Sequence, residues 1–489
     1  MTEMLTGVRT LQNFIDGEWR DATGAELLED RNPATGEVLA RVPLSGAADV
    51  DAAVAAARRA QAAWRETSPL VRARAIFALR DVLVEHRDEI AELVTRDMGK
   101  TLPDATAEVG RGIESVEAAC GMPHLLKGEN LEGVATGVDV SLIRQPVGVI
   151  GAITPFNFPA MIPLWFLPYA LACGNAFVLK PSERDPLPSE RIVQLLSGIS
   201  EIPAGLVALV HGGQDVVNAL LDHPGVDAIS FVGSAATARH VMSRGAANGK
   251  RVQALGGAKN SMVIMPDADP DVMVGGVMGS AFGAAGQRCL AGSIAVLVGS
   301  REEQDRARDR LVEAAAKLQT GDGLDPRTDV CPVVSAEARE RLAGEIAAAE
   351  ADGITVVLDG RGDPGPGGAN LGPTILDDIP EGHRVLTEEL FGPILSLVRV
   401  PDLAAAVEAV NASRYGNASV IFTESGGAAR EYRYRVQAGM VGVNVGVAAP
   451  VAWFPFSGWK DSIDGDLHAN GHDAVEFYTR KKVVTERWA

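Results

Sequence analysis

The sequence has few cysteines, and they form no framework. Only four occur in 489 residues, at positions 120, 173, 289 and 331, which is neither a disulfide pattern nor the paired spacing of a zinc site. The eight histidines show no ligand spacing either, so we expect no metal. Residues 1–20 carry charges and lack the apolar core of a targeting segment. These absences predict a chain made for a reducing compartment, and we expect the cytoplasm.

Positive charge is also in deficit. Lysine and arginine number 45 against 64 aspartates and glutamates, which leaves a formal net charge of −19. Such an excess argues against nucleic acid and acidic membrane surfaces as partners, and an anionic ligand would need a local positive site. The length and the apolar fraction of 46% predict a soluble globular protein of two or three domains.

Charge is missing altogether between Arg144 and Lys180, but this stretch is no membrane span. Five prolines and three glycines divide it into pieces too short to cross a bilayer as one helix. We expect a strand over 147–153, a helix over 160–172 and a strand over 176–179. Continuous apolar strands joined by a helix are typical of a parallel sheet buried on both faces.

The rest of the chain alternates between strand and helix patterns, which predicts an α/β fold with two doubly wound domains. Residues 8–45 favour short strands and turns, including 13–19 and 32–39. The expected helices are 47–64, 70–97, 104–121, 214–222, 235–245, 269–284, 301–318, 335–351, 402–411 and 427–437. The expected strands are 138–145, 206–210, 227–232, 251–255, 260–265, 293–299, 354–358, 394–399, 418–422 and 440–445.

One cysteine lies among small residues, in Gly286-Gln287-Arg288-Cys289. A neighbouring positive charge lowers the pKa of a thiol, and the thiolate is the nucleophile. Cys289 therefore fits a covalent nucleophile toward a carbonyl. It fits a buried structural cysteine equally well, and the local sequence does not decide between the two.

The usual dinucleotide fingerprint G-x-G-x-x-G is absent. Gly233 and Ser234 follow a predicted strand and open a helix, where a phosphate can meet the helix N-terminus. Lys180 and Glu183 follow another strand end, where such sheets bind ligands. Each pattern alone also fits an ordinary turn.

Six motifs in order resemble those of the aldehyde dehydrogenase family. They are Thr154-Pro155-Phe156-Asn157-Phe158-Pro159, Leu179-Lys180-Pro181-Ser182-Glu183, Phe231-Val232-Gly233-Ser234, Gly286-Gln287-Arg288-Cys289, Glu388-Glu389-Leu390-Phe391-Gly392-Pro393 and Phe454-Pro455-Phe456-Ser457-Gly458-Trp459-Lys460. The resemblance extends from Asn13 to Val484. It implies an NAD-binding domain (8–122 and 147–256), a catalytic domain (257–455), and a small β oligomerisation excursion with the C-terminal loop (123–146 and 456–489). It also implies a homotetramer, a dimer of dimers.

The resemblance assigns roles to residues of these motifs. Cys289 would attack an aldehyde, Asn157 would stabilise the oxyanion, and Phe456 would line the aldehyde tunnel. The residues implied in cofactor binding are Thr154, Phe156, Lys180, Glu183, Arg184, Gly233, Ser234, Glu389 and Phe391. A carboxylate at Glu183 would repel a 2′-phosphate, which favours NAD over NADP.

Hydrolytic members of the family carry a glutamate directly before Leu-Gly-Gly, and this chain has Ala254 there. General-base assistance is worth about 10²–10⁴ in rate, so we expect slow hydrolysis of a Cys289 thioester. A thiol acceptor needs less assistance, which favours coenzyme A as co-substrate. The alternative is that another base, such as Glu389, activates water.

Local matches such as Gly256-Gly257-Ala258-Lys259-Asn260 resemble the CoA-acylating methylmalonate-semialdehyde dehydrogenase branch. In that branch two arginines hold the substrate carboxylate, and they correspond here to Arg111 and Arg288. The implied reaction converts methylmalonate or malonate semialdehyde, CoA and NAD into propionyl- or acetyl-CoA, carbon dioxide and NADH. The alternatives are a hydrolytic enzyme for another short acidic aldehyde and a non-catalytic structural or binding relative.

Overall fold

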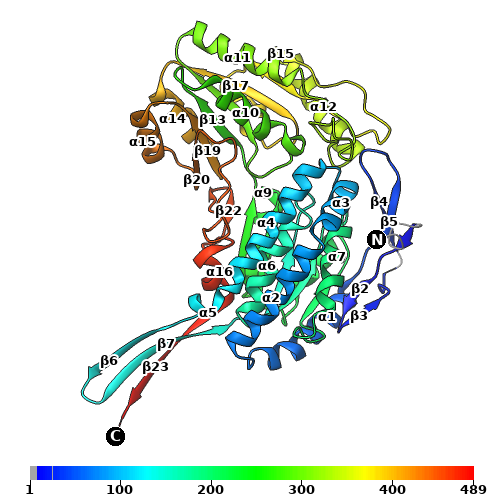
Figure 1. The fold of residues 1–489 in the computed structure, drawn as a ribbon, viewed down its shortest axis with the longest axis vertical. Helices are drawn as coiled ribbons and strands as arrows, with labels where there is room; N and C mark the ends of the chain where they lie inside the picture. Colours follow the sequence, from blue (N-terminus) through cyan, green and yellow to red (C-terminus); the bar gives the residue numbers. More distant parts are fainter. Residues whose placement is uncertain (1–7, 25, 489) are drawn as a thin grey trace.

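A computed structural model describes residues 8–24 and 26–488, and it shows two large α/β units with a projecting β arm (Figure 1). The first unit is built on an eight-stranded sheet of order β22-β12-β11-β8-β9-β10-β2-β3. The five central strands are parallel: β8 (Val149–Ile153), β9 (Ala176–Lys180), β10 (Val207–Leu209), β11 (Ala228–Gly233) and β12 (Arg251–Gly256). The antiparallel edge strands are β2 (Asn13–Ile15), β3 (Glu18–Arg20) and β22 (Ile463–Asp464).

Helices cover both faces of this sheet, which explains why its central strands are apolar along their length. Right-handed crossovers put α6 and α7 on one face and α8 and α9 on the other. Helix α6 packs under α2 and α4, and α8 packs against α1. The helices of this unit are α1 (Ala47–Trp64), α2 (Pro69–Glu85), α3 (Arg87–Met98), α4 (Leu102–Cys120), α5 (Met122–Leu125), α6 (Met161–Ala172), α7 (Leu187–Ser197), α8 (Gln214–Asp222) and α9 (Ala235–Ala247).

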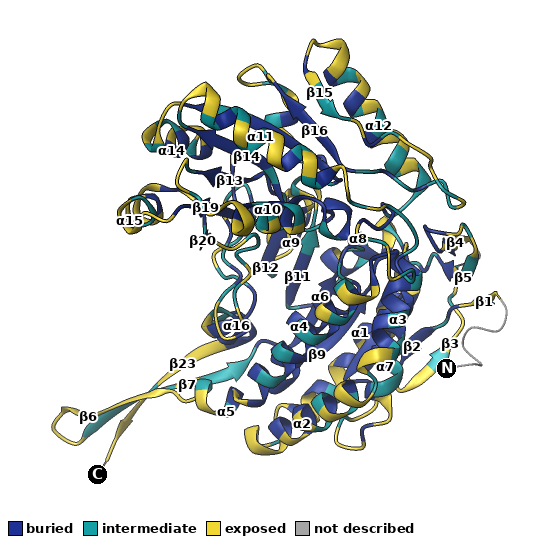
Figure 2. Cartoon of the chain, turned by 45° about the horizontal axis from the view of Figure 1, so that its top comes forward, coloured by how far each residue is buried: buried dark blue, intermediate teal, exposed yellow. Residues whose placement is uncertain are grey.

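The second unit has a seven-stranded sheet of order β15-β16-β17-β14-β13-β19-β20, parallel except for β15. Its strands are β13 (Asn260–Ile264), β14 (Gly292–Val298), β15 (Thr355–Leu358), β16 (Thr374–Asp377), β17 (Ile394–Val400), β19 (Ala418–Phe422) and β20 (Met440–Val443). Its helices are α10 (Pro270–Ala281), α11 (Arg301–Ala315), α12 (Ala336–Ala351), α13 (Arg384–Thr387), α14 (Leu403–Asn411) and α15 (Gly426–Arg435). The helices show buried inner faces and exposed outer faces (Figure 2).

Three smaller sheets complete the chain. Strands β1 (Arg9–Thr10), β4 (Leu27–Arg31) and β5 (Val38–Pro43) form one, and β18 (Tyr415–Gly416) pairs with β21 (Trp459–Lys460). Strands β6 (Glu129–Ala135), β7 (Val138–Pro146) and β23 (Thr479–Arg487) form an antiparallel arm that projects from the body (Figure 1). The arm exposes apolar side chains, among them Leu131 at 64% and Val483 at 63%.

The α/β fold class is as expected, and several details differ. Helix α7 was not among the expected helices. The helix expected over 70–97 breaks at His86, whose φ of −101° and ψ of 15° are not helical. Residues 32–37 form a turn, and strand β5 begins only at Val38. Strand β16 was not expected. Helix α16 (Gly471–Tyr478) was also missed, and it packs its apolar face into the core of the first unit.

Helix α6 is buried throughout, as a core helix of only 12 residues. No helix among residues 8–24 and 26–488 combines the length and apolarity needed to cross a membrane.

Candidate active site

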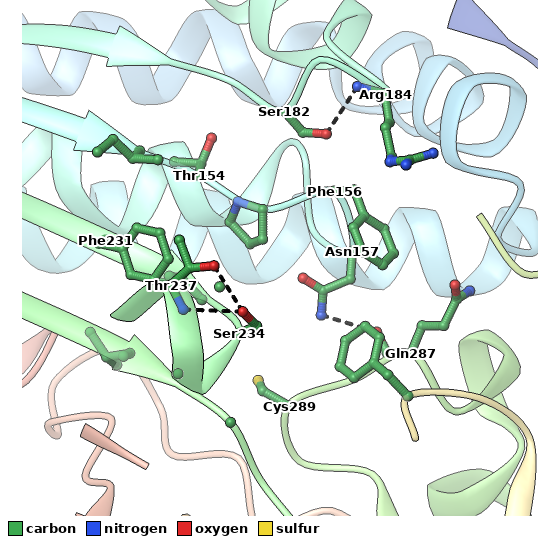
Figure 3. A pocket seen from close by; sticks show the side chains of 18 of the residues that line it. Thr154, Phe156, Asn157, Ser182, Arg184, Phe231, Ser234, Thr237, Gln287 and Cys289 are labelled. Atoms are coloured by element: carbon green, nitrogen blue, oxygen red, sulfur yellow. Dashed lines mark hydrogen bonds between the residues drawn. The ribbon is translucent and has the colours of Figure 1, made fainter. Parts of the chain in front are cut away.

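The carboxyl ends of β8, β9 and β11 meet at one edge of the first sheet, because these strands are parallel and adjacent. The loops that follow them border a cavity of about 1000 Å³, and residues of the second unit close its other side. Figure 3 shows Cys289, Asn157 and Ser234 facing this cavity from different segments. Sequence motifs far apart in the chain therefore converge on one site. The expected residues that line it are Thr154, Phe156, Asn157, Lys180, Glu183, Arg184, Gly233, Ser234, Cys289, Glu389, Phe391 and Phe456.

Cys289 follows a tight 3-10 turn, Gly283–Gly286, in which Ala284 and Ala285 have φ of 48° and 53°. Its side chain is half-buried, and its backbone carbonyl accepts hydrogen bonds from Asn260 Nδ2 (2.9 Å) and Asn417 Nδ2 (2.8 Å). The left-handed alanines and the two amides fix the position of this cysteine more tightly than an ordinary loop would.

The Cys289 thiol is less acidic than the neighbouring Arg288 suggested. Burial raises the pKa of Cys289 to about 12, and the Glu389 carboxylate adds to that rise. Arg288 lowers the pKa least of all the groups involved, because its guanidinium pairs with Asp104 of α4 at 2.7 Å. Arg288 thus lowers the pKa of this thiol, as expected, but burial and Glu389 outweigh its effect.

Asn157 lies in the loop between β8 and α6 and is 5% exposed. Its amide Nδ2 donates to the carbonyl of Gln287 at 3.0 Å. A primary amide has two N–H bonds, so one remains for a ligand. Gln287 is itself anchored, since its Oε1 accepts from the backbone N–H of Val334 at 2.9 Å.

The residues at the strand ends form a polar wall. Lys180 Nζ donates to Glu183 Oε2 at 2.6 Å, and this ammonium holds the pKa of Glu183 below its usual value although burial acts to raise it. Ser234 caps α9, where its hydroxyl accepts from the N–H of Thr237. The hydroxyl of Thr154 is buried and has no partner among the described residues. Gly233 is required by packing, because a Cβ there would lie 2.4 Å from the Phe231 ring.

Glu389 and Phe391 close the cavity from the second unit. Glu389 Oε1 accepts from the N–H of Ala258 at 3.0 Å, and burial raises the pKa of this carboxyl to about 7. Phe391 has φ of 58°, and its ring meets that of Phe156 edge-on at 5.8 Å. The two rings come from different units and pack edge-on against each other at the wall of the cavity.

Replacement of Glu389 by glutamine should accelerate alkylation of Cys289 by iodoacetamide. A carboxylate disfavours a nearby thiolate, so its removal lowers the thiol pKa and raises the rate about tenfold for each pKa unit. The difference should vanish below pH 7, where Glu389 of the wild type is itself protonated and neutral. The matched control is Glu388→Gln, because Glu388 pairs with Arg414 at the surface. Equal alkylation rates for wild type and Glu389→Gln at pH 8.5 would contradict the coupling.

The apolar end of the cavity contains Phe456, as expected for a tunnel residue. Its ring packs on Trp165 of α6 at 4.8 Å, and Trp165 also lines the cavity. Sequence analysis missed Trp165 because it lies in a helix that is apolar on every side. Trp453 and Phe454, by contrast, are 56% and 64% exposed.

Neither of the two expected substrate arginines is among the described residues that line the cavity. Arg288 pairs with Asp104, and Arg111 pairs with Glu114 at 2.7 Å and also donates to the carbonyl of Pro450. Both partners lie on α4, so each guanidinium is held by a carboxylate of the same helix.

Comparison with known proteins agrees with this geometry. The model of the aldehyde dehydrogenase family matches residues 19–484. The chain belongs to the aldehyde dehydrogenase family. It is 48% identical to malonate-semialdehyde dehydrogenase 1 of Geobacillus thermodenitrificans over 99% of this chain and 100% of that protein.

Two solved structures of aldehyde dehydrogenases are also similar over 99% of both chains. One is a protein from Sinorhizobium meliloti, assigned as a methylmalonate-semialdehyde dehydrogenase, in complex with NAD. Its TM-score is 0.96, and its sequence is 42% identical. The other is methylmalonate-semialdehyde dehydrogenase from Oceanimonas doudoroffii, with a TM-score of 0.95 and 44% identity.

In an aldehyde dehydrogenase, the side chain that strand β12 directs toward the thiol decides whether water has a general base. The structure shows that this side chain belongs to position 255 and not to position 254. Leu255 lines the cavity, whereas Ala254 is buried in the core on the opposite side of the strand. The expected absence of a carboxylate therefore concerns Leu255. Neither residue is a proton acceptor, so the consequence for hydrolysis is unchanged.

A second detail of the same strand concerns the space around Ala238 of α9. Ala238 is 1% exposed, and a Cβ at Gly256 would lie 2.7 Å from its methyl group. The glycine on β12 thus leaves room for the alanine on α9.

Proposed function

We propose that this aldehyde dehydrogenase oxidises malonate or methylmalonate semialdehyde with NAD, releases carbon dioxide and transfers the acyl group to CoA. The observation that carries the proposal is a half-buried cysteine beside an amide with an available N–H, with an apolar Leu255 where water would need a base. The names of the relatives from Geobacillus, Sinorhizobium and Oceanimonas support the substrate class.

The cavity fits NAD. The capped N-terminus of α9 offers backbone N–H groups and a positive dipole end for the pyrophosphate. The unpartnered Thr154 hydroxyl is free for a ligand. Lys180 and Glu183 are placed for ribose hydroxyls, and Glu183 is kept ionised, which disfavours the 2′-phosphate of NADP. Glu389 and Phe391 would hold the nicotinamide end, with Phe156 and Arg184 bordering the same groove.

The chemistry of acyl-enzyme formation follows from Cys289 and Asn157. The Cys289 thiolate attacks the aldehyde carbon, and the oxygen becomes an oxyanion. The second N–H of Asn157 and the backbone N–H of Cys289 stabilise that charge in a site shielded from water. When bound, NAD supplies the hydride acceptor. The product on the protein is a thioester at Cys289.

The thioester then loses carbon dioxide and leaves with CoA. The carboxylate is β to the thioester carbonyl, so the electrons of the breaking C–C bond move into that carbonyl as an enolate, which is then protonated. The same oxyanion donors favour this step. The thiolate of CoA attacks the remaining thioester and releases Cys289. Leu255 offers water no base to compete with that thiol.

The experiment that tests the proposal supplies both semialdehydes with NAD, with and without CoA. We expect continuous NADH formation only with CoA, together with propionyl- or acetyl-CoA and carbon dioxide identified by mass spectrometry. Equal turnover in CoA-free buffer with a free acid as product would refute CoA transfer.

One observation favours a second function, a hydrolytic aldehyde dehydrogenase for another short acidic aldehyde. Glu389 lines the cavity, and a carboxyl with a pKa of about 7 is suited to act as a general base near neutral pH. The CoA-free assay separates this alternative from the first.

We also propose that Arg111 and Arg288 bind the substrate carboxylate, which would replace Glu114 and Asp104 as their partners. Arg111→Met should raise KM for malonate semialdehyde by about 10- to 100-fold, the worth of a charge-assisted hydrogen bond. KM for uncharged propionaldehyde should not change. Arg96→Met, which removes a surface arginine paired with Glu92, is the control. An equal rise for both aldehydes would contradict the assignment.

The exposed arm supports a homotetramer, since unpaired strand edges and apolar side chains call for a covering subunit. Val483→Arg on β23 should lower the mass measured by light scattering without unfolding the monomer. An unchanged mass for Val483→Arg would argue against the arm as the interface. The four free cysteines agree with residence in the cytoplasm.

A further inference from the structure

The loop that carries Asn157 is tied to α4 by a buried ion pair. Lys100 precedes α4, and Glu108 lies on it; their side chains are 1% and 0% exposed, and Lys100 Nζ lies 2.5 Å from Glu108 Oε2. Neither is among the described residues that line the cavity. Neither belongs to a motif that sequence analysis singled out.

Each member of the pair holds a different part of the loop. Lys100 Nζ donates to the backbone carbonyl of Asn157 at 2.8 Å and lies 4.1 Å from the centre of the Phe158 ring. Glu108 Oε1 accepts from the N–H groups of Ala160 (2.9 Å) and Met161 (3.1 Å), where α6 begins. The loop is therefore fixed at the backbone of Asn157 and again where the loop ends and α6 begins.

Residues 154–160 belong to no strand or helix, and few backbone hydrogen bonds define their path. The N–H of Thr154 donates to the carbonyl of Lys180 at 3.1 Å, and the carbonyl of Phe158 accepts from the N–H of Ile162 at 3.1 Å, but neither bond holds the backbone of Asn157 itself. Among the described residues, the side chain of Asn157 makes one hydrogen bond, to the carbonyl of Gln287. Without Lys100, the buried carbonyl of Asn157 would also lose its donor, and such groups are nearly always paired.

A buried ion pair is a poor device for stability alone, because the cost of removing two charges from water offsets their attraction. Apolar residues of similar volume often stabilise a core as well or better. The contacts of this pair are instead directional and converge on one loop.

We propose that Lys100 and Glu108 are positioning residues that hold the amide of Asn157 at the oxyanion. The proposal rests on the oxyanion role of Asn157 proposed above. A misplacement of about 1 Å can slow a reaction about 10²-fold, so loss of the pair should slow acylation while Cys289 and the cofactor groove stay intact.

The experiment measures the first turnover of NADH formation in a double-mutant cycle. Asn157→Ala should slow it about 10²–10³-fold. Lys100→Met with Glu108→Gln, which removes both charges together, should slow it about 10²-fold. The combined variant should be no slower than Asn157→Ala, because the pair acts only through that amide.

Three further measurements separate positioning from general stability. Alkylation of Cys289 by iodoacetamide and the affinity for NAD should stay near wild type in the pair variant. Arg399→Met with Asp377→Asn removes a partly buried pair, at 2.5 Å on β17 and β16, in which Arg399 is 12% and Asp377 1% exposed, and should lower only the melting temperature. If Lys100→Met with Glu108→Gln fails to fold, Glu108→Gln alone replaces it, because glutamine keeps an acceptor for the N–H groups of Ala160 and Met161. We expect a smaller loss of rate from Glu108→Gln, and no further loss when it is combined with Asn157→Ala.

The outcomes distinguish the two proposals. If Asn157→Ala is slow and the combined variant is slower still, by the product of the two separate losses in rate, only the positioning role is overturned. Acylation at the wild-type rate in the pair variant would do the same. A wild-type rate for Asn157→Ala would overturn the oxyanion role and the positioning role together.

Discussion

Replacement of Cys289 by alanine is expected to abolish NADH formation, with a loss of about 10⁶-fold, as when an acyl-transfer enzyme loses its nucleophile. No other cysteine can substitute, because Cys120, Cys173 and Cys331 are buried outside the cavity. Stopped-flow absorbance of NADH with either semialdehyde and CoA measures the effect.

The matched control is Cys120→Ala, which removes a buried thiol from α4 and should leave turnover unchanged. NAD binding by Cys289→Ala should also persist, since the residues of the groove come from β8, β9, β11 and the second unit. Measurable turnover in Cys289→Ala would refute covalent catalysis and revive the reading of Cys289 as a packing residue.

The sequence predicts those parts of the site whose location follows from the residue type and from the position at the end of a strand. Strands buried on both faces show as uninterrupted apolar runs, and the residues after them necessarily gather at one sheet edge. Lys180 and Ser234 were located in this way, and family resemblance added their roles and also Thr154. The second unit supplied Glu389 by motif alone.

What sequence could not supply are facts that depend on packing in three dimensions. Lys100 and Glu108 read as ordinary charged residues, since nothing local shows that both are buried against the Asn157 loop. Arg288 was expected to serve the thiol, but Asp104, 184 positions away, holds its guanidinium. Successive side chains of β12 point to opposite faces, so a shift of one residue decides whether Ala254 or Leu255 meets the cavity. Only the structure shows that it is Leu255.

That register leads to the second large effect, a change of reaction by one substitution. Leu255→Glu should place a carboxylate beside the thioester and raise CoA-independent release of free acid by about 10²–10⁴-fold, the usual value of a general base. Leu255→Gln has nearly the same shape but no base, so it should remain dependent on CoA. The measurement is the ratio of free acid to acyl-CoA formed by the two variants.

Ala254→Glu offers the sharper comparison, because it adds the same carboxylate one residue earlier. Ala254 is 0% exposed within the core, so a glutamate there would be buried without a partner and should lower stability instead of promoting hydrolysis. Acid release from Ala254→Glu, or none from Leu255→Glu beyond that of Leu255→Gln, would contradict the assignment of Leu255. The fate of the acyl group would then depend on Glu389, a carboxyl that the cavity already contains, and not on what β12 lacks.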